Sequence, residues 1–244
     1  MRVLLLIALT AVSAMNIVAA DFSLGAVFAI STAPYKSYDK YIMVSPFATY
    51  DGQRFYVQGA GAGVHLLKNE VHKISAGVSY FGLHFDPDDT DNRAMKNLNR
   101  RKSTMMADLT YSVITKVGVG KIKASRDVLG ISDGYTVDAC WQLPLIREKY
   151  TIMPSAGVLW SSREQADYYF GVSRGESWRS GLKRHTATSN FSPYLKLDAK
   201  YHFTDRWSAV ASVHVNFLTG DVKDSPMVGK SATIGGAIGA QFTF

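Results

Sequence analysis

The segment that decides the fold is the last one, Ala232-Thr233-Ile234-Gly235-Gly236-Ala237-Ile238-Gly239-Ala240-Gln241-Phe242-Thr243-Phe244. One parity is apolar (Ala232, Ile234, Ala240, Phe242, Phe244) and the other is small or polar (Thr233, Gly235, Gly239, Gln241, Thr243). Alternation of this kind predicts a strand with one apolar and one polar face. A strand that ends on a phenylalanine is typical of the strand that closes a transmembrane β-barrel, so we expect Phe244 to mark the closure.

The first residues predict export. A short positive start, Met1-Arg2, precedes a mostly apolar run over 3–12 and the small residues Val18-Ala19-Ala20. This order is typical of a secretory signal peptide, and polar residues within the run argue against the alternative of a membrane anchor. We therefore expect a signal peptide over 1–20 and a single barrel domain over 21–244.

Composition favours strands over membrane helices. The 244-residue chain has a mean hydropathy of -0.02, 12% aromatic residues and 20 glycines. After residue 20, no apolar run approaches the roughly 20 residues that a membrane helix needs, whereas barrel strands distribute their hydrophobicity in alternation. The net charge of +7 suits a phosphate-rich lipid leaflet, and export argues against nucleic acid as a partner. The single cysteine, Cys140, excludes an intramolecular disulfide and is expected to be a small buried filler.

Period-two alternation predicts eleven strand segments. They run over 22–32, 41–50, 54–67, 71–85, 103–115, 118–127, 134–144, 149–160, 191–203, 206–218 and 231–244. Short turns alternate with long connections at 86–102, 161–190 and 219–230, and bacterial barrels place short turns in the periplasm and long loops outside.

An odd strand number conflicts with the even count of bacterial barrels. The hydrophobic phase flips within 54–67 at Gly59-Ala60-Gly61-Ala62-Gly63, and glycine runs can hold a bulge or a sharp reversal. A reversal there gives an antiparallel transmembrane barrel of 12 strands, the number we expect; an early segment outside the wall would give 10.

Several motifs resemble those of one family. They are Ala33-Pro34-Tyr35-Lys36-Ser37-Tyr38-Asp39, then Tyr168-Tyr169-Phe170-Gly171-Val172-Ser173 with Glu176-Ser177 and Ser180-Gly181-Leu182, and finally Gly220-Asp221 with Asp224-Ser225-Pro226-Met227. In this order they are similar to the MipA/OmpV family of outer-membrane proteins, including its YiaT-like members. Ser37 departs from the glycine that many members carry, which bears on the local turn.

The resemblance implies a non-enzymatic barrel in the outer membrane of a Gram-negative bacterium. It implies a scaffold for murein synthesis and remodelling, with a lytic transglycosylase and a penicillin-binding protein as partners and no cofactor. A narrow solute channel and a surface adhesin are the alternatives. The motif residues expected to form a partner site or a plug are Pro34, Tyr35, Tyr168, Tyr169, Phe170, Gly171, Val172, Ser173, Ser180, Gly181, Asp224, Ser225 and Pro226.

The long connection over 161–190 is the most unusual element, because it combines aromatic and basic residues. Two interpretations stay open for it: it folds into the lumen as a plug, or it presents an exposed face to a partner or glycan. The basic residues of the preceding long loop, Arg93, Lys96, Arg100, Arg101 and Lys102, could contact lipopolysaccharide phosphates or neutralise the acidic run 86–91.

Catalytic and metal chemistry receive weaker support from the sequence. Ser212 and His214 share one strand face, which a polar lumen produces by chance, and no acidic third member is recognisable. The acidic run 86–91 lacks the glycine and distal glutamate of an EF-hand loop, so we expect a solvated loop and no metal or catalytic residue.

Overall fold

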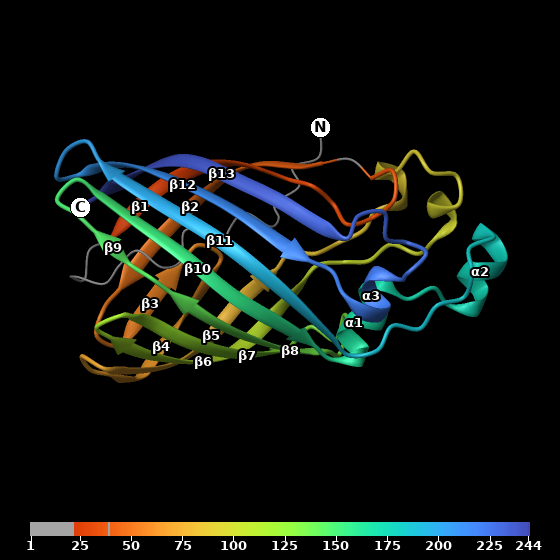
Figure 1. Ribbon diagram of the computed structural model, residues 1–244, viewed down its shortest axis with the longest axis horizontal. Helices are drawn as coiled ribbons and strands as arrows, with labels where there is room; N and C mark the ends of the chain where they lie inside the picture. The colour runs from red at the N-terminus through yellow and green to blue at the C-terminus, as the bar shows by residue number, and fades with distance from the viewer. Residues whose placement is uncertain (1–21, 39) are drawn as a thin grey trace.

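The computed structural model describes residues 22–38 and 40–244, so the predicted signal peptide lies outside the described residues. The chain forms a long barrel with short turns and the C-terminus at one end and loops with short helices at the other (Figure 1). The strands are β1 (Ser23–Ser31), β2 (Tyr41–Asp51), β3 (Phe55–Gln58), β4 (Gly61–Lys68), β5 (His72–Phe81), β6 (Thr104–Thr115), β7 (Gly118–Asp127), β8 (Tyr135–Gln142), β9 (Leu145–Ile146), β10 (Tyr150–Ser161), β11 (Asn190–His202), β12 (Trp207–Phe217) and β13 (Ala232–Thr243). The helices are α1 (Arg163–Phe170), α2 (Arg174–Ser180) and α3 (Gly220–Lys223).

Each strand from β1 to β7 and from β10 to β12 pairs antiparallel with the next, and β13 pairs with β1 from Thr243 opposite Ser23 to Gly235 opposite Ser31. The sheet therefore closes on itself and leaves no free end in the order of strands. β8 and β9 both pair with β10, so together they make one wall strand that Leu143-Pro144 interrupts. The wall thus has 12 strands, which confirms the expected number and excludes 10.

The reversal at the glycine run makes the twelfth strand. β3 and β4 pair from Gln58 opposite Gly61, so Gly59 and Ala60 alone form the turn. Gly59 has φ +60°, as the first central residue of a type II′ hairpin turn does. The flip of hydrophobic phase is therefore a hairpin and not a bulge.

Two of the predicted strands were drawn too long. The segment 71–85 ends at Phe81, because Phe85 is fully buried among the loops beyond the barrel and bridges Arg101 there. The segment 134–144 stops at Gln142 before Pro144, whose missing N–H cannot join a ladder. The long loop predicted over 86–102 accordingly runs from residue 82 to 103.

The outer face carries an apolar belt between aromatic residues. Leu195 and Leu197 are exposed on β11, whereas Asp198, which follows them on the opposite face of the strand, is buried, as the alternation predicts. Aromatic side chains are exposed near the turn end, where they include Phe22, Phe55, Tyr150, Tyr201, Phe203, Trp207 and Phe244, and others are exposed near the loop end, where they include Tyr135, Phe191 and Phe217. Two aromatic girdles around an apolar band are the pattern of an outer-membrane barrel.

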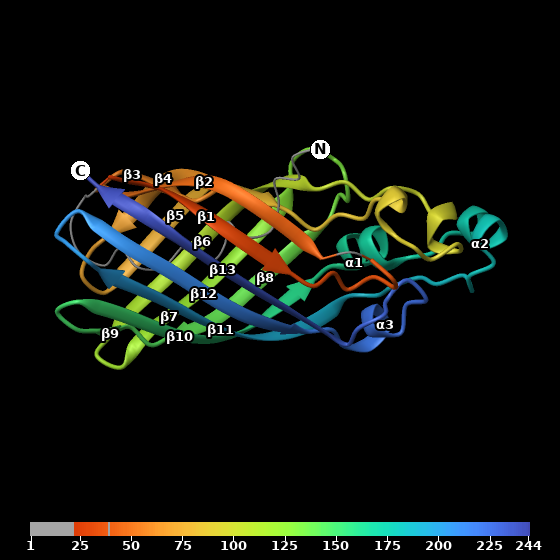
Figure 2. The same ribbon diagram turned by 90° about the horizontal axis from the view of Figure 1, so that it is seen from above.

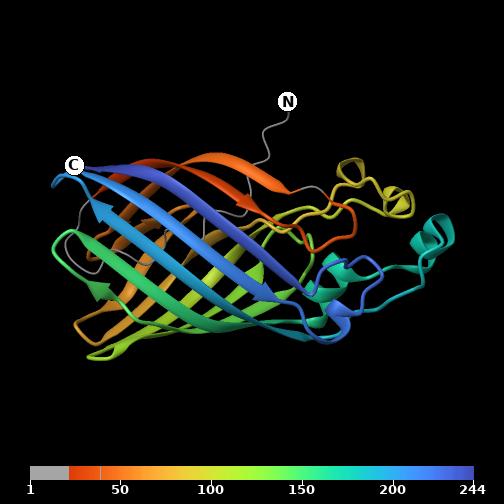
Figure 3. The same cartoon turned by 45° about the horizontal axis from the view of Figure 1, so that its top comes forward.

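None of the described helices is long and apolar enough to cross a bilayer. The view from above and the view turned by 45° agree that α1, α2 and α3 all lie at the end opposite the C-terminus (Figure 2; Figure 3).

The turn at Gly59 yields a first prediction. Gly59→Val should lower the free energy of unfolding by about 1 to 3 kcal/mol, because a β-branched residue is strained at positive φ. Urea unfolding of the refolded barrel measures it. Ala60→Val is the control, since Ala60 has no positive φ. An equal loss in both variants would contradict the assignment of the strain to Gly59.

Candidate functional site

The loops at one end of the barrel pack into a cap with a hydrophobic core of its own. Four connections contribute, those before β2, between β5 and β6, between β10 and β11, and between β12 and β13. The buried members are Ala33, Tyr35, Tyr38, Phe85, Met95, Leu98, Ala166, Tyr169, Phe170, Val172, Ala187, Val222, Met227 and Val228. A loop cluster that buries this much apolar surface behaves as a folded layer over the barrel mouth.

The motif Tyr168–Ser173 lies at the centre of the cap, where α1 ends. The last carbonyls of a helix have no partner within it and need donors from elsewhere. The Tyr35 hydroxyl donates to the Tyr169 carbonyl at 3.3 Å, and the Ser225 hydroxyl donates to the Phe170 carbonyl at 2.6 Å. Arg101 donates through Nη2 to the Gly171 carbonyl at 3.0 Å. Three consecutive carbonyls are thus satisfied by side chains from three different loops.

The aromatic side chains of the motif strengthen the same junction. Tyr169 is 1% exposed, packs on Phe81 with ring centroids 5.6 Å apart, and donates to the Lys102 carbonyl at 2.9 Å. Tyr168 accepts from the Lys102 N–H at 2.8 Å. Burial raises the pKa of Tyr169 and of Tyr35, so both hydroxyls stay protonated and can donate. The motif therefore joins α1 to the loop between β5 and β6.

The other end of α1 is fixed to the barrel wall. Ser162 caps the helix, because its hydroxyl accepts from the Gln165 N–H at 3.4 Å. Gln165 is buried, its Oε1 accepts from the Ser132 hydroxyl at 2.7 Å, and its side chain fills the space beside Gly134. α1 thus extends from the loop between β7 and β8 to the junction formed by Tyr35, Arg101 and Ser225.

A buried ion pair holds α2 to the loop between β5 and β6. Arg101 Nη2 lies 2.8 Å from Glu176 Oε1, and Glu176 is 2% exposed. The same oxygen accepts from the Asn99 N–H at 2.9 Å. The other oxygen, Oε2, accepts from the Ser173 N–H at 3.0 Å and from its hydroxyl at 2.8 Å, which completes a capping box. Both carboxylate oxygens are therefore fully satisfied.

These donors determine the charge of Glu176. Burial pushes the pKa of its carboxyl up, but the backbone N–H groups of Ser173 and Asn99 and the charge of Arg101 outweigh burial, and the pKa is lowered overall. The carboxylate is consequently ionised wherever the cap is folded near neutral pH. Arg101 also lies over the Tyr168 ring, 5.9 Å from its centroid, so one guanidinium links α2, the end of α1 and its own loop.

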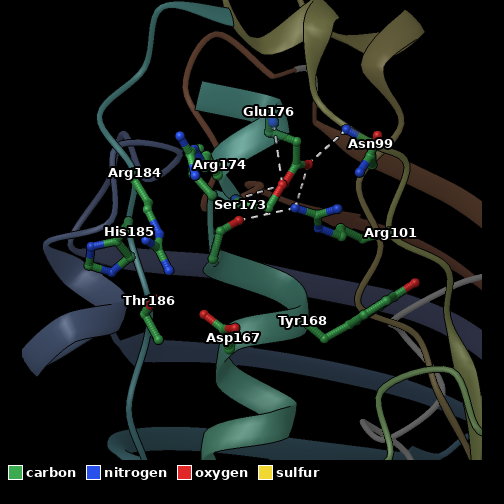
Figure 4. Close-up of a pocket in the computed structure, with 12 residues that line it drawn as sticks. Asn99, Arg101, Asp167, Tyr168, Ser173, Arg174, Glu176, Arg184, His185 and Thr186 are labelled. Atoms are coloured by element: carbon green, nitrogen blue, oxygen red, sulfur yellow. Dashed lines mark hydrogen bonds and ion pairs between the residues drawn. The ribbon is translucent and has the colours of Figure 1, made fainter. Parts of the chain in front are cut away.

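A cleft of 370 Å³ opens beside this ion pair (Figure 4). Arg184, His185 and Thr186 line one side, and Asn99 and Arg101 line the other. In the described part of the chain, no carboxylate pairs with Arg184 or with Arg174 beside it. The polar lining of the cleft suits a ligand that forms hydrogen bonds and carries an anionic group, in contrast to the apolar lining of most small-molecule pockets.

The structure brings the predicted motif residues together but divides them between core and surface. Pro34, Tyr35, Tyr169, Phe170, Gly171, Val172 and Ser225 are buried, Tyr168, Ser180 and Pro226 are half-buried, and Ser173, Gly181, Asp224 and Phe244 are exposed. Neither open interpretation of 161–190 describes this arrangement. Its tyrosines and phenylalanine form the cap core, whereas Trp178 is 88% exposed at the outer helix. A role of these residues in binding a partner stays a prediction.

The structure also divides the basic residues expected to meet lipopolysaccharide. Arg101 is buried against Glu176, so it is unavailable to lipid. The spacing of Ser173 and Glu176 is that of a capping box and could have predicted the start of α2, but nothing in the sequence indicated that Arg101 pairs with Glu176. Arg100 pairs with Asp86 at 2.8 Å and Asp88 at 3.3 Å, so it neutralises the acidic run. Arg93, Lys96 and Lys102 are exposed, and their contact with lipopolysaccharide stays a prediction.

The described residues contain no metal-binding cluster, and the predicted pair of Ser212 and His214 does not form. Over 22–38 and 40–244, no cluster of three or more histidine, cysteine or acidic side chains could hold a metal ion. The Ser212 hydroxyl has no hydrogen-bond partner in the same ranges, so it is not paired with His214. Cys140 is a free, half-buried thiol beside Gly157, close to its expected role as a filler.

The comparisons with known proteins agree with the geometry. The family model described as MltA-interacting protein MipA matches residues 24–244. The chain belongs to the MipA family. MltA-interacting protein of Escherichia coli (strain K12) is 38% identical over 87% of this chain and 86% of its own length. The putative outer membrane protein YiaT of the same strain is 32% identical over 93% of this chain and 92% of its own.

A more distant relative is also named as an outer-membrane protein. Outer membrane protein OmpV of Vibrio cholerae is 24% identical over 73% of this chain and 69% of its own length. Among solved structures, the NanC porin has a TM-score of 0.46 at 10% identity, over 91% of this chain and 100% of its own. This member of the MipA family is accordingly an outer-membrane β-barrel protein.

The buried ion pair yields a second prediction. Glu176→Ala should open the cap, because it leaves the Arg101 charge buried without a partner, a change that costs about 3 to 5 kcal/mol in protein interiors. Hydrogen exchange should then rise at the Asn99 and Ser173 amides, and limited proteolysis should cut between α1 and β11 while the barrel stays intact.

Glu164→Ala is the matched control, since Glu164 lies in the first turn of α1 and is exposed. It should leave both measurements unchanged. If Glu176→Ala behaves like this control, the ion pair does not hold the cap.

Proposed function

We propose that this chain is a non-enzymatic scaffold in the outer membrane that binds enzymes of murein remodelling, a lytic transglycosylase and a penicillin-binding protein. The observation that carries the proposal is the relationship to a protein named MltA-interacting protein over 86% of that protein's length. The pair of Ser212 and His214, which the sequence offered for a hydrolase, does not form, since the Ser212 hydroxyl has no hydrogen-bond partner among the described residues.

The end of the barrel opposite the cap is the surface we assign to these partners. Short turns of bacterial barrels face the periplasm, where murein lies. All charged residues in the turns at this end of the barrel are exposed. The basic residues (Arg54, Lys116, Arg147, Lys149, Arg206) outnumber the acidic ones (Glu70, Glu148, Asp205). We call these residues the periplasmic rim. Such a ring of charge favours association with a partner that carries a complementary acidic patch.

Interactions inside the barrel hold part of the rim rigid. Asp51 on β2 lies 2.9 Å from Lys73 on β5, and 2.7 Å and 3.2 Å from His65 and Lys68 on β4. Lys68 Nζ also donates to the carbonyls of Asp51 and Gly52, at 3.0 and 2.9 Å. The turn that carries Arg54 is therefore fixed before a partner arrives, which reduces the entropy lost on binding.

A third prediction tests this surface. The double variant Lys149→Glu, Arg206→Glu should weaken binding of a soluble lytic transglycosylase from the same cells by about tenfold or more. The reason is that it replaces two attractive charges by two repulsive ones, and a loss of about 1.4 kcal/mol of binding free energy is a tenfold loss of affinity. Surface plasmon resonance on the barrel in lipid nanodiscs measures the affinity, and the loss should shrink at high salt.

The control reverses charges at the other end, with Arg163→Glu and Lys183→Glu, two exposed residues of the cap connection. It should leave the affinity unchanged. Equal weakening by both double variants would remove the rim from the proposal, and no binding by the unaltered chain would remove the scaffold itself.

A narrow channel is the second candidate, and the charged lumen favours it. Lys196 and Asp198 face inward 2.9 Å apart on β11, and Lys123 lies 3.6 Å from Asp108 between β7 and β6. Barrels of this size leave little free lumen, in contrast to porins of 16 or more strands. Any conduction would need a path through or around the cap.

A fourth prediction separates the two candidates. Planar-bilayer recordings of the intact chain should show no steady conductance. Removal of residues 165–185 should open a pore, because the deletion removes most of α1, the helix that lies next to the strand ends (Figure 1). A steady open pore in both forms would make the channel the leading function.

A further inference from the structure

The cleft of 370 Å³ in the cap contains positive charge that the folded chain does not neutralise (Figure 4). Arg101 and Glu176 in its lining cancel each other as an ion pair. Arg174 and Arg184 line the cleft too, and neither forms an ion pair or a hydrogen bond within the part of the chain that the structure describes. Asp167 is the other carboxylate of the lining. Two guanidinium groups against one carboxylate give the cleft a net positive charge, which favours an anionic ligand.

The backbone that carries the two arginines is fixed before a ligand arrives. Val172 donates its N–H to the His185 carbonyl at 2.8 Å and accepts from the His185 N–H at 3.1 Å. The segments that carry Arg174 and Arg184 are therefore joined by an antiparallel bridge. The His185 ring is held as well, because its Nε2 lies 2.7 Å from the Asp221 carbonyl. A site whose walls are already in place loses less entropy when a ligand binds.

Groups that suit hydroxyls lie beside the arginines. Asp167 accepts from the Ala187 N–H through Oδ1 at 2.9 Å, and among the described residues its Oδ2 accepts no hydrogen bond. Thr186 adds an exposed hydroxyl to the lining, and Asn99 adds an amide. A carboxylate oxygen, a hydroxyl and an amide together donate to and accept from neighbouring hydroxyl groups. A bare inorganic anion would use the arginines and leave these groups to water.

The size of the cleft and an exposed indole beside it both suit a sugar. A volume of 370 Å³ lies near the lower limit of small-molecule sites, which is about 300 Å³. Trp178 follows Arg174 by four residues on α2, and residues at this spacing are neighbours on a helix surface. Its side chain is 88% exposed. An indole offers a flat apolar face for the C–H groups of a sugar ring and keeps its N–H for a hydrogen bond.

We infer that the cleft binds an acidic sugar from the outer side of the membrane. Its carboxylate or phosphate group lies between Arg174 and Arg184, its hydroxyls bind Asp167 and Thr186, and a following sugar ring packs on Trp178. Two sources offer this chemistry, namely the sugars of the lipopolysaccharide around the barrel and free acidic saccharides. The inference goes beyond the scaffold role and does not depend on it, because the periplasmic rim lies at the opposite end.

Isothermal titration calorimetry on the barrel, refolded in detergent without lipopolysaccharide, tests the inference. The probes are glucuronate, glucose 6-phosphate, glucose and inorganic phosphate. Both acidic sugars should bind, and glucose and inorganic phosphate should bind at least about tenfold more weakly, because each offers only part of what the cleft can satisfy. Failure of both acidic sugars to bind would overturn the inference. Inorganic phosphate that binds as tightly as glucose 6-phosphate would overturn it too, since the site would then select charge alone.

A matched pair of neighbouring residues places the binding in the cleft. Arg184→Gln should weaken glucuronate binding by about tenfold, because a contact between arginine and a carboxylate is charge-assisted. Lys183→Gln is the control, since Lys183 is exposed, carries the same charge and does not line the cleft. It should leave the affinity unchanged. Equal weakening by both variants would contradict the site, because it would reflect the charge of the whole cap.

A longer probe tests the place of the second ring. A hyaluronan tetrasaccharide, in which glucuronate alternates with N-acetylglucosamine, should bind more tightly than glucuronate. Trp178→Ala should abolish this gain and leave glucuronate binding unchanged. A gain that persists in Trp178→Ala would overturn the packing on the indole.

Nanodiscs with and without lipopolysaccharide separate the two sources. If lipopolysaccharide in the disc weakens the binding of glucose 6-phosphate, its own sugars occupy the cleft. If the affinity is the same in both discs, the ligand is a free saccharide. Either result supports an acidic-sugar site only if Arg184→Gln lowers the affinity in discs without lipopolysaccharide, and no effect of this variant there would overturn the site.

Discussion

Three consecutive carbonyl groups at the end of α1 are the constraint on which the cap depends. A helix that ends inside a packed layer cannot leave these groups to water, and here Tyr35, Ser225 and Arg101 supply the donors. Each donor belongs to a different loop, so satisfying one helix end fixes the position of three connections. The aromatic core around Tyr169 then adds apolar burial to an arrangement whose geometry the hydrogen bonds already determine.

The ion pair of Arg101 and Glu176 extends the same logic to α2. Its carboxylate receives backbone donors as well as the guanidinium, which offsets the desolvation that a bare buried pair would suffer. A single arginine thereby contributes to two junctions. This explains why the segment that resembles other family members continues past Phe170 to Ser173 and Glu176: the motif covers a helix end, the connection and the next capping box.

The sequence predicted the barrel well and the cap poorly, for a physical reason. Side chains of a barrel strand face lipid and lumen in turn, so the alternation predicted the limits of β7 and β10 to within a residue. The change of hydrophobic phase at Gly59 located the hairpin between β3 and β4. The cap has no period. Phe85 looked like the end of a strand and Arg101 like a lipid contact, because only the folded loops bring Phe85 to Tyr35 and Arg101 to Glu176. The family motifs pointed to residues that the cap buries, such as Tyr35 and Tyr169, but not to what these residues contact.

The way in which the cap draws on distant loops has a consequence for the biogenesis of the protein. Ser225 and Met227 lie between β12 and β13, whereas Tyr35 lies between β1 and β2. These residues come together only when the last strand has paired with the first. The cap core can thus be completed only after closure, and contacts of such long sequence separation form late in folding. An ordered cap therefore indicates that the barrel has closed, and a probe that binds the folded cap would recognise closed barrels alone.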